Sequence, residues 1–149
     1  MKFLCDQMLG TLAKWLRIYG FDTYFPKTEI DDKKLLEISK KENRILITRD
    51  KDLIYHARRE NIEVIEIDKI DIDEQIAIVI KNFKVDNSKI LTRCLLCNSL
   101  LNDIKKEKVK DKVPIKVFNN FDRFWFCKNC NKIYWKGSHY DKMIEKIQK

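Results

Sequence analysis

The chain contains few residues that break regular structure, with 3 glycines and 2 prolines among 149 residues. This scarcity excludes a collagen-like or low-complexity protein. No stretch approaches the roughly 18 consecutive apolar residues that a membrane-spanning helix needs. An acidic residue at position 6 comes too early for the apolar core of a signal peptide. We therefore expect a cytoplasmic protein without a membrane segment.

Apolar residues are plentiful enough to build a core. They make up 44% of the chain, so the sequence does not describe a disordered polycation. A chain of this length forms one domain, or one domain with a small appendage. No internal repeat is visible in the sequence.

Positive charge is concentrated at one end. Residues 1–90 hold 17 Lys and Arg against 17 Asp and Glu, whereas residues 91–149 hold 14 against 6. Such an excess either keeps a lysine-rich surface soluble or marks a basic appendage that holds a polyanion. Four of the five cysteines fall in the basic segment. We therefore predict two parts, residues 1–90 and residues 91–149.

The first part alternates between two kinds of apolar pattern. Short apolar runs predict strands, and apolar residues spaced three or four apart predict helices between them. The predicted strands are Lys2–Cys5, Phe21–Phe25, Arg44–Thr48 and Ile62–Ile67, and the predicted helices are Met8–Tyr19, Asp32–Glu42, Lys51–Glu60 and Asp73–Phe83. Strict alternation favours a three-layer α/β fold, a parallel sheet with helices on both faces.

The second part predicts a small β-rich unit. Its strand-like pieces are Val113–Phe118, Phe124–Phe126 and Ile133–Trp135, and a helix capped by Ser138 is expected over Tyr140–Gln148. The lysine-rich residues 105–112 predict a solvated loop or, alternatively, an arm that follows phosphates. Most aromatic residues here should form the core of this unit, and one or two exposed rings could stack on unpaired bases.

Aspartates follow the predicted strands. Asp6 comes after the first strand, Asp50 and Asp52 come after the third, and Asp31 and Asp32 open the helix that leads into it. Ligands of open α/β sheets bind beyond the carboxyl ends of the strands. Carboxylate oxygens suit Mg²⁺ or Mn²⁺, and such ions can activate water for attack on a phosphodiester. These stretches therefore predict a divalent-metal site at one sheet edge.

Each aspartate also has a simpler interpretation as a helix cap. Asp32 is a good N-cap for the helix that follows it, and Asp6, Asp50 or Asp52 could cap their own helices. For any one of them alone, capping is favoured. Their joint placement favours the metal site, because caps accept Ser, Thr and Asn equally well. Thr48 and Arg49 add a hydroxyl and a phosphate-binding guanidinium at the same edge.

Two cysteine pairs predict a structural zinc site. Cys94 and Cys97 form one Cys-x-x-Cys pair, Cys127 and Cys130 form the other, and 29 residues separate them. Two thiolates on each tight knuckle fill a tetrahedral zinc shell and leave no position for water. Disulfide or redox chemistry is the alternative. Asn98 and Asn131, directly after the pairs, suit knuckle backbone with positive φ, and Cys5 is expected to be a small buried strand residue.

Several motifs resemble one family. These motifs are Phe3-Leu-Cys-Asp-Gln-Met-Leu-Gly10, Leu12-Ala-Lys-Trp-Leu-Arg17, Gly20-Phe-Asp-Thr-Tyr24, Leu46-Ile-Thr-Arg-Asp-Lys-Asp-Leu53, the cysteine pairs and Tyr134-Trp-Lys-Gly-Ser-His-Tyr140. Together they resemble the Mut-seven C-terminal ribonuclease family. The resemblance covers nearly the whole chain. It implies a PIN-like nuclease that cleaves RNA with Mg²⁺ or Mn²⁺. Its acidic residues would fall on Asp6, Asp32, Asp50 and Asp52, with Asp31 as an alternative to Asp32.

The resulting hypothesis is a metal-dependent ribonuclease with a basic zinc ribbon. Asp6, Asp50 and Asp32 would be the chief metal ligands, and Asp52 would complete or orient them. RNA, single-stranded or structured, would contact Arg49, Lys106, Lys108, Lys110 and His139. The alternatives are a PIN-plus-ribbon endonuclease of ribosomal RNA maturation and a non-catalytic RNA-binding protein. An aspartyl phosphatase is disfavoured, because Leu53 follows the second aspartate where that class usually has Thr or Val.

Overall fold

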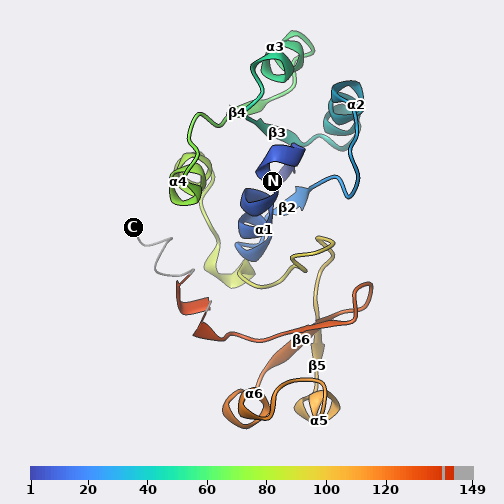
Figure 1. Ribbon diagram of the computed structural model, residues 1–149, viewed down its shortest axis with the longest axis vertical. Coiled ribbons are helices and arrows are strands. Elements are labelled where there is room, and N and C mark those ends of the chain that lie inside the picture. The colour runs from blue at the N-terminus through green and yellow to red at the C-terminus, as the bar shows by residue number, and fades with distance from the viewer. Residues whose placement is uncertain (139, 143–149) are drawn as a thin grey trace.

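The computed structural model describes residues 1–138 and 140–142, which form a parallel sheet with helices and, apart from it, a small antiparallel sheet (Figure 1). The parallel sheet has the order β2-β1-β3-β4. Its strands are β1 (Lys2–Cys5), β2 (Asp22–Tyr24), β3 (Ile45–Thr48) and β4 (Val64–Glu66). All four strands and their parallel pairing agree with the sequence prediction.

Helices cover both faces of this sheet. They are η1 (Gln7–Leu9), α1 (Gly10–Ile18), α2 (Asp32–Glu42), α3 (Lys51–Arg59), α4 (Ile72–Asn82) and η2 (Asn87–Lys89). The expected α/β architecture is therefore confirmed. Across the described residues, no helix is long and apolar enough to cross a membrane.

Successive side chains of the central strands point to opposite faces, which assigns each helix to its layer. Phe3 and Cys5 of β1 lie in one core cluster with residues of α1 and α4, whereas Leu4 lies in a second cluster with residues of α2 and α3. All three are fully buried. Cys5 is thus the buried strand residue that the sequence predicts, and burial raises the pKa of its thiol far above the ordinary value.

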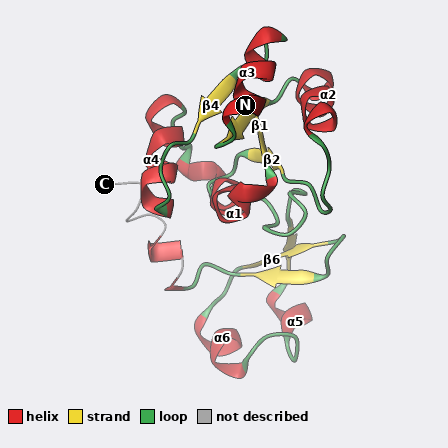
Figure 2. Cartoon of the chain, turned by 45° about the horizontal axis from the view of Figure 1, so that its top comes forward, coloured by secondary structure: helices red, strands yellow, loops and turns green. Residues whose placement is uncertain are grey.

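The antiparallel sheet follows in the chain. Its strands are β5 (Asn102–Ile104), β6 (Phe124–Cys127) and β7 (Lys132–Tyr134), in that spatial order. Two short helices, α5 (Lys106–Val109) and α6 (Ile115–Asn120), lie between β5 and β6 in sequence. They lie on the side of this sheet that is remote from the α/β part (Figure 2).

Two predictions in this region are wrong. The piece Val113–Phe118 is not a strand, because Pro114 is the N-cap of α6 and its carbonyl accepts a 3.0 Å hydrogen bond from the Phe118 N–H. Proline is tolerated there, since the N-cap N–H has no partner within the helix and its absence loses no helical hydrogen bond. The lysine-rich residues 105–112 are not simply a loop, because α5 anchors them through Val109, which is fully buried. Most of the predicted helix Tyr140–Gln148 lies outside the described residues.

Candidate metal and nucleic-acid sites

Asp6 lies at the carboxyl edge of the parallel sheet. Its N–H donates to the carbonyl of Ile47 over 3.2 Å, which extends the pairing of β1 and β3 by one residue. The side chain is only 6% exposed. One carboxylate oxygen accepts a 2.9 Å bond from the Met8 N–H and so caps η1. Strand pairing and capping together hold this carboxylate in one position.

A single hydroxyl links Asp6 to the end of β3. Thr48 is fully buried, and its Oγ1 donates to the second carboxylate oxygen of Asp6. The Thr48 Oγ1 in turn accepts a 3.0 Å bond from the Asp50 N–H. The Asp50 side chain caps α3, accepting from the N–H groups of Asp52 at 2.9 Å and Leu53 at 3.3 Å. Thr48 therefore fixes the spacing between two of the predicted acidic residues.

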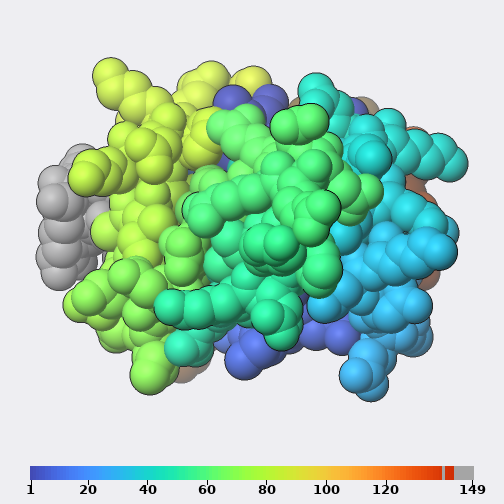
Figure 3. All heavy atoms as spheres, turned by 90° about the horizontal axis from the view of Figure 1, so that it is seen from above, coloured from blue at the N-terminus to red at the C-terminus, as the bar shows by residue number. Residues whose placement is uncertain are grey.

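Asp32 belongs to the same electrostatic group. Burial raises the pKa of its carboxyl above the ordinary value, and the negative charges of Asp50, Asp6 and Asp31 raise it further. Such effects act over short distances, so the three stretches converge at one edge. In the view from above, the N-terminal segment shows between α3 and α2 (Figure 3). The structure thus links Asp6 to Asp50 through Thr48 and places Asp32 where it interacts electrostatically with both.

The two neighbouring aspartates of α2 have different positions. Asp31, not Asp32, is the N-cap, and its Oδ1 accepts a 2.8 Å bond from the Lys34 N–H. The predicted cap at Asp32 is therefore wrong. Asp32 is the first helical residue, and no backbone N–H holds its carboxylate within the described structure. This difference favours Asp32 over Asp31 as the group that is free to bind a ligand.

His56 is a neighbour that the sequence reasoning missed. It lies on α3, four residues after Asp52, and its electrostatic interaction with Asp32 lowers the pKa of that carboxyl. The sequence could have indicated His56, because residues four apart on a helix share a face, and His56 follows Asp52 by four residues on a predicted helix. Asp52 is exposed in the first turn of α3. Arg49 is half-buried, and within the described residues it makes no hydrogen bond or ion pair.

The carboxylate oxygens of the aspartates lie farther apart than the ligand atoms of a closed metal shell. In the described part of the chain, only the cysteines form a group of three or more potential ligand side chains whose ligand atoms all lie within 4.8 Å of one another. Wider spacing is expected for carboxylates that repel each other. The donor set still consists of hard carboxylate oxygens, of which those of Asp6 are buried and those of Asp32 and Asp50 are exposed. This chemistry fits Mg²⁺ or Mn²⁺ better than a soft metal.

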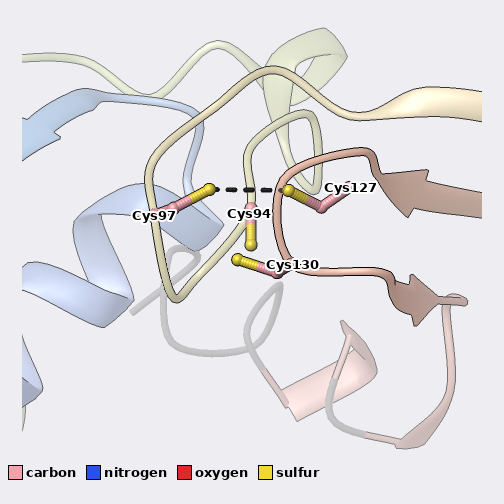
Figure 4. Close-up of side chains that lie close together, drawn as sticks. All are labelled: Cys94, Cys97, Cys127 and Cys130. Atoms are coloured by element: carbon pink, nitrogen blue, oxygen red, sulfur yellow. Dashed lines mark hydrogen bonds between the residues drawn. The ribbon is translucent and has the colours of Figure 1, made fainter.

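The four predicted cysteines do form a compact cluster (Figure 4). The two knuckles have the same geometry. Asn98, with φ 71°, donates its N–H to the Cys94 carbonyl at 2.9 Å, and Asn131, with φ 54°, donates to the Cys127 carbonyl at 2.8 Å. The predicted positive φ at both asparagines is confirmed. Two alike knuckles facing each other suit a tetrahedral ion such as zinc.

Hydrogen bonds distribute charge unevenly within the cluster. Burial opposes ionisation of Cys97, but hydrogen bonds of Ser99 outweigh it and lower the pKa of Cys97 to about 6. The bond to Cys97 raises the pKa of Cys130 to about 12. Cys97 Sγ lies 3.5 Å from Cys127 Sγ, well beyond the roughly 2.05 Å of a disulfide. The hydrogen bonds thus favour ionisation of Cys97 and oppose that of Cys130, and a thiophilic cation would bind the cysteines as thiolates.

Asn98 also attaches the first knuckle to the parallel sheet. Its Oδ1 accepts a 3.0 Å bond from the Thr23 N–H on edge strand β2, and its Nδ2 donates to Asp22 over 2.7 Å. Arg17 of α1 donates to the Leu95 carbonyl over 2.7 Å. The sequence predicts the backbone shape at Asn98 but not this docking, because the partners lie about 75 residues away.

The residues predicted to contact RNA differ in how exposed they are and in whether they already have partners. Lys106 contacts Asp122 at 3.2 Å and lies 5.0 Å from the centre of the Phe118 ring, so it is already engaged. Lys108 and Lys110 are exposed. His139 lies outside the described residues.

The chain thus combines an α/β sheet that has acidic residues at the ends of its strands with a small antiparallel sheet that carries four clustered cysteines. The family model described as Mut7-C RNAse domain matches residues 1–147, so the chain belongs to this family. The chain is also 28% identical, over 103 residues, to the human protein named exonuclease mut-7 homolog. That match covers 65% of this chain and 12% of the human protein.

Proposed function

We propose that this protein is a metal-dependent ribonuclease whose catalytic centre is the carboxyl edge of the parallel sheet. The observation that carries the proposal is the convergence of Asp6, Asp32 and Asp50, from three separate stretches, into one interacting group. Membership of a family described as an RNAse domain supports RNA as the substrate. We assign the strand order β2-β1-β3-β4, with acidic residues at the strand ends, to the PIN-like class.

In this proposal, Asp6, Asp32 and Asp50 would hold Mg²⁺ or Mn²⁺, and Asp52 would complete or orient the set. A bound divalent cation supplies an activated water and neutralises charge on the phosphate. Hydrolysis would leave 5′-phosphate and 3′-hydroxyl ends.

The chain's own residues supply position and charge. Thr48 fixes the orientation of Asp6 through its hydroxyl. Burial and the neighbouring acidic groups raise the pKa of the Asp32 carboxyl, so a bound cation would offset the unfavourable negative charge there. Arg49 is unpaired within the described residues and would bind a phosphate next to the reacting one.

We assign residues 1–90 to the nuclease part and residues 91–149 to a zinc ribbon that binds RNA. The compact cysteine quartet supports Zn²⁺ as the structural ion. Lys108 and Lys110 are exposed and would contact phosphates, and Lys106 and His139 remain proposed contacts. The protein would act in the cytoplasm.

The test is cleavage of end-labelled RNA and of matched DNA with Mn²⁺, Mg²⁺ or EDTA. We expect metal-dependent cleavage of RNA that is lost in Asp6→Asn. Asp71→Asn is the matched control, because Asp71 caps α4 through a 3.1 Å bond and asparagine caps equally well. Cleavage that survives unchanged in Asp6→Asn would place the activity elsewhere. RNA binding without metal-dependent cleavage would identify a non-catalytic RNA-binding protein.

A further inference from the structure

We propose that Trp125 on β6, with Arg123 and Lys136, forms a stacking site for single-stranded RNA. This inference rests on the proposed ribonuclease function and adds a substrate-holding surface separate from the acidic edge. Arg123 and Lys136 are not among the RNA contacts that the sequence predicts, and for the rings it predicts only that one or two of the aromatic residues of this part, which include Trp125, could stack on bases.

The three side chains form one cation–aromatic cluster. The guanidinium carbon of Arg123 lies 5.1 Å from the centre of the Trp125 ring, and Lys136 Nζ lies 5.6 Å from it. Lys136 Nζ also lies 4.7 Å from the centre of the Tyr140 ring. Both cations are exposed, whereas Trp125 is half-buried. The cluster thus alternates positive charge and aromatic surface.

Strand geometry explains why the indole is available. Phe124 is 2% exposed and packs edge-on against Trp135, so it belongs to the core of the small sheet. Trp125 points to the opposite face, because successive side chains of a strand alternate. On that face it is paired with Tyr134 and packs in part against the cysteine cluster. One side of the ring is therefore held rigidly while the rest remains accessible.

Neither Arg123 nor Lys136 is held by a strong ion pair within the described part of the chain. Arg123 lies 3.7 Å from Asp103, and both side chains are highly exposed, at 73% and 80%. Such exposed pairs contribute little, so the guanidinium can exchange this carboxylate for a phosphate. Lys136 makes no ion pair with any residue that the structure describes. Lys132, 5.8 Å from the centre of the Tyr134 ring, adds a further cation nearby.

Single-stranded RNA matches both components. A base can stack on the indole, and the phosphates on either side can meet Arg123 and Lys136. The surrounding segment, residues 91–149, has 14 basic and 6 acidic residues, which favours a polyanion. An acidic peptide would satisfy the cations but has no flat base to occupy the ring. The small sheet lies apart from the α/β part (Figure 2), so loss of this site should weaken binding rather than the chemical step.

The experiment measures binding of a fluorescent single-stranded RNA to the full chain by anisotropy, with the Asp6→Asn substitution present throughout to prevent cleavage. We expect Trp125→Leu to weaken binding about tenfold and Trp125→Phe to weaken it much less. The double variant Arg123→Gln, Lys136→Gln should weaken binding and reduce the salt dependence by about two phosphate contacts. Lys116→Gln is the charge control, because Lys116 is an exposed lysine of α6 in the same segment and lies outside residues 105–112.

Unchanged affinity in a folded Trp125→Leu protein would overturn the proposal. If that variant does not fold, the arginine–lysine double variant decides, and unchanged affinity and salt dependence there would overturn it equally. So would an acidic peptide that competes as well as RNA. The proposed function fails separately, if wild-type protein binds RNA but does not cleave it. Cleavage with unchanged KM in Trp125→Leu would instead reject the stacking site alone.

Discussion

The hydroxyl of Thr48 has a larger part at the acidic edge than its size suggests. It donates to Asp6 and accepts from the Asp50 N–H, so it holds two carboxylate-bearing segments in register. Without it, the second oxygen of Asp6 would remain buried with no hydrogen-bond donor from β3. Groups that orient metal ligands are often nearly as important as the ligands themselves.

Thr48→Val should therefore reduce RNA cleavage by about 10- to 100-fold, because valine has the same shape but no hydroxyl. It should also lower the free energy of unfolding by about 1–3 kcal/mol, since the buried Asp6 loses a partner. Thr48→Ser keeps the hydroxyl and should retain most activity. Cleavage rates and denaturant unfolding of both variants measure these effects, and equal activity in the valine and serine variants would refute the role.

Asp22 gives a pH-dependent contribution at the junction with the cysteine knuckle. Burial alone would raise the pKa of its carboxyl, but hydrogen bonds from Asn98 and Arg44 outweigh burial and lower it below the ordinary 3.8. A carboxyl with a lowered folded-state pKa stabilises the protein above its unfolded pKa. This stabilisation is lost as the pH falls through the folded value.

Asp22→Asn should therefore be less stable than wild type at pH 7, and the difference should shrink as the pH falls below about 4. Denaturant midpoints of both proteins at pH 7 and pH 3 test this expectation. Asp103→Asn is the control, because Asp103 is 80% exposed in a weak pair with Arg123. A difference for Asp22→Asn that is constant with pH would show that its charge contributes nothing.

At the scale of elements, the start of α2 holds an aspartate that caps the helix next to the aspartate that we propose as a metal ligand. Asp31 caps the helix, whereas the charge of Asp32 is disfavoured by burial and by its acidic neighbours. Asp31→Ala should lower the free energy of unfolding by about 1 kcal/mol, because a cap is lost. Asp32→Asn should lose cleavage and retain or gain stability. Parallel measurements of unfolding and cleavage distinguish the two, and the reverse pattern would exchange their roles.

The strands and long helices were predictable because each buried surface requires apolar residues at a regular spacing, and that spacing is visible in the sequence. Strand β3 is an uninterrupted apolar run, and α2 begins and ends at the predicted residues. The helix α6 was missed, since its short apolar run also suits a strand and only the position of Pro114 decides between them. Short elements depend on tertiary contacts, such as the burial of Val109, which a single sequence does not display.

The candidate site was predictable to a similar extent. Strand ends placed Asp6 and Asp50 at one edge, because parallel strands share an edge for their carboxyl ends. The choice between Asp31 and Asp32 required coordinates, since both positions suit a cap. The roles of Thr48 and Asn98 also required them, because each role is a contact between segments that are distant in the sequence.

At the scale of the whole molecule, the first cysteine knuckle joins the two parts. Leu95 and Asn98 belong to the knuckle by sequence, yet they hydrogen-bond to Arg17 and Thr23 of the α/β part. Asn98 thereby occupies a backbone donor on β2, an edge strand whose free groups would otherwise be open to pairing with another chain. An ion that orders the knuckle should therefore stabilise the parallel sheet as well as the small sheet.

Removing the ion that we propose the cysteine cluster binds should test this coupling. A thiophilic chelator should disrupt the small sheet and also lower the unfolding free energy of the α/β part by about 1–3 kcal/mol, because the contacts made by the knuckle are lost with it. Asn98→Gly is the matched variant. Glycine adopts the φ of 71° without strain and should preserve metal binding, but it removes both side-chain hydrogen bonds.

The α/β part of Asn98→Gly should therefore be weakened before the chelator is added, and it should respond less to the chelator than wild type does. Metal content by elemental analysis and thermal unfolding by far-ultraviolet circular dichroism measure the two effects. If wild type loses its metal with no change in the unfolding of the α/β part, the knuckle contacts the parallel sheet without stabilising it. If Asn98→Gly abolishes metal binding instead, the Asn98 side chain is needed to form the knuckle itself. The contacts of the knuckle with the parallel sheet would then follow from metal binding and would not be what stabilises the sheet.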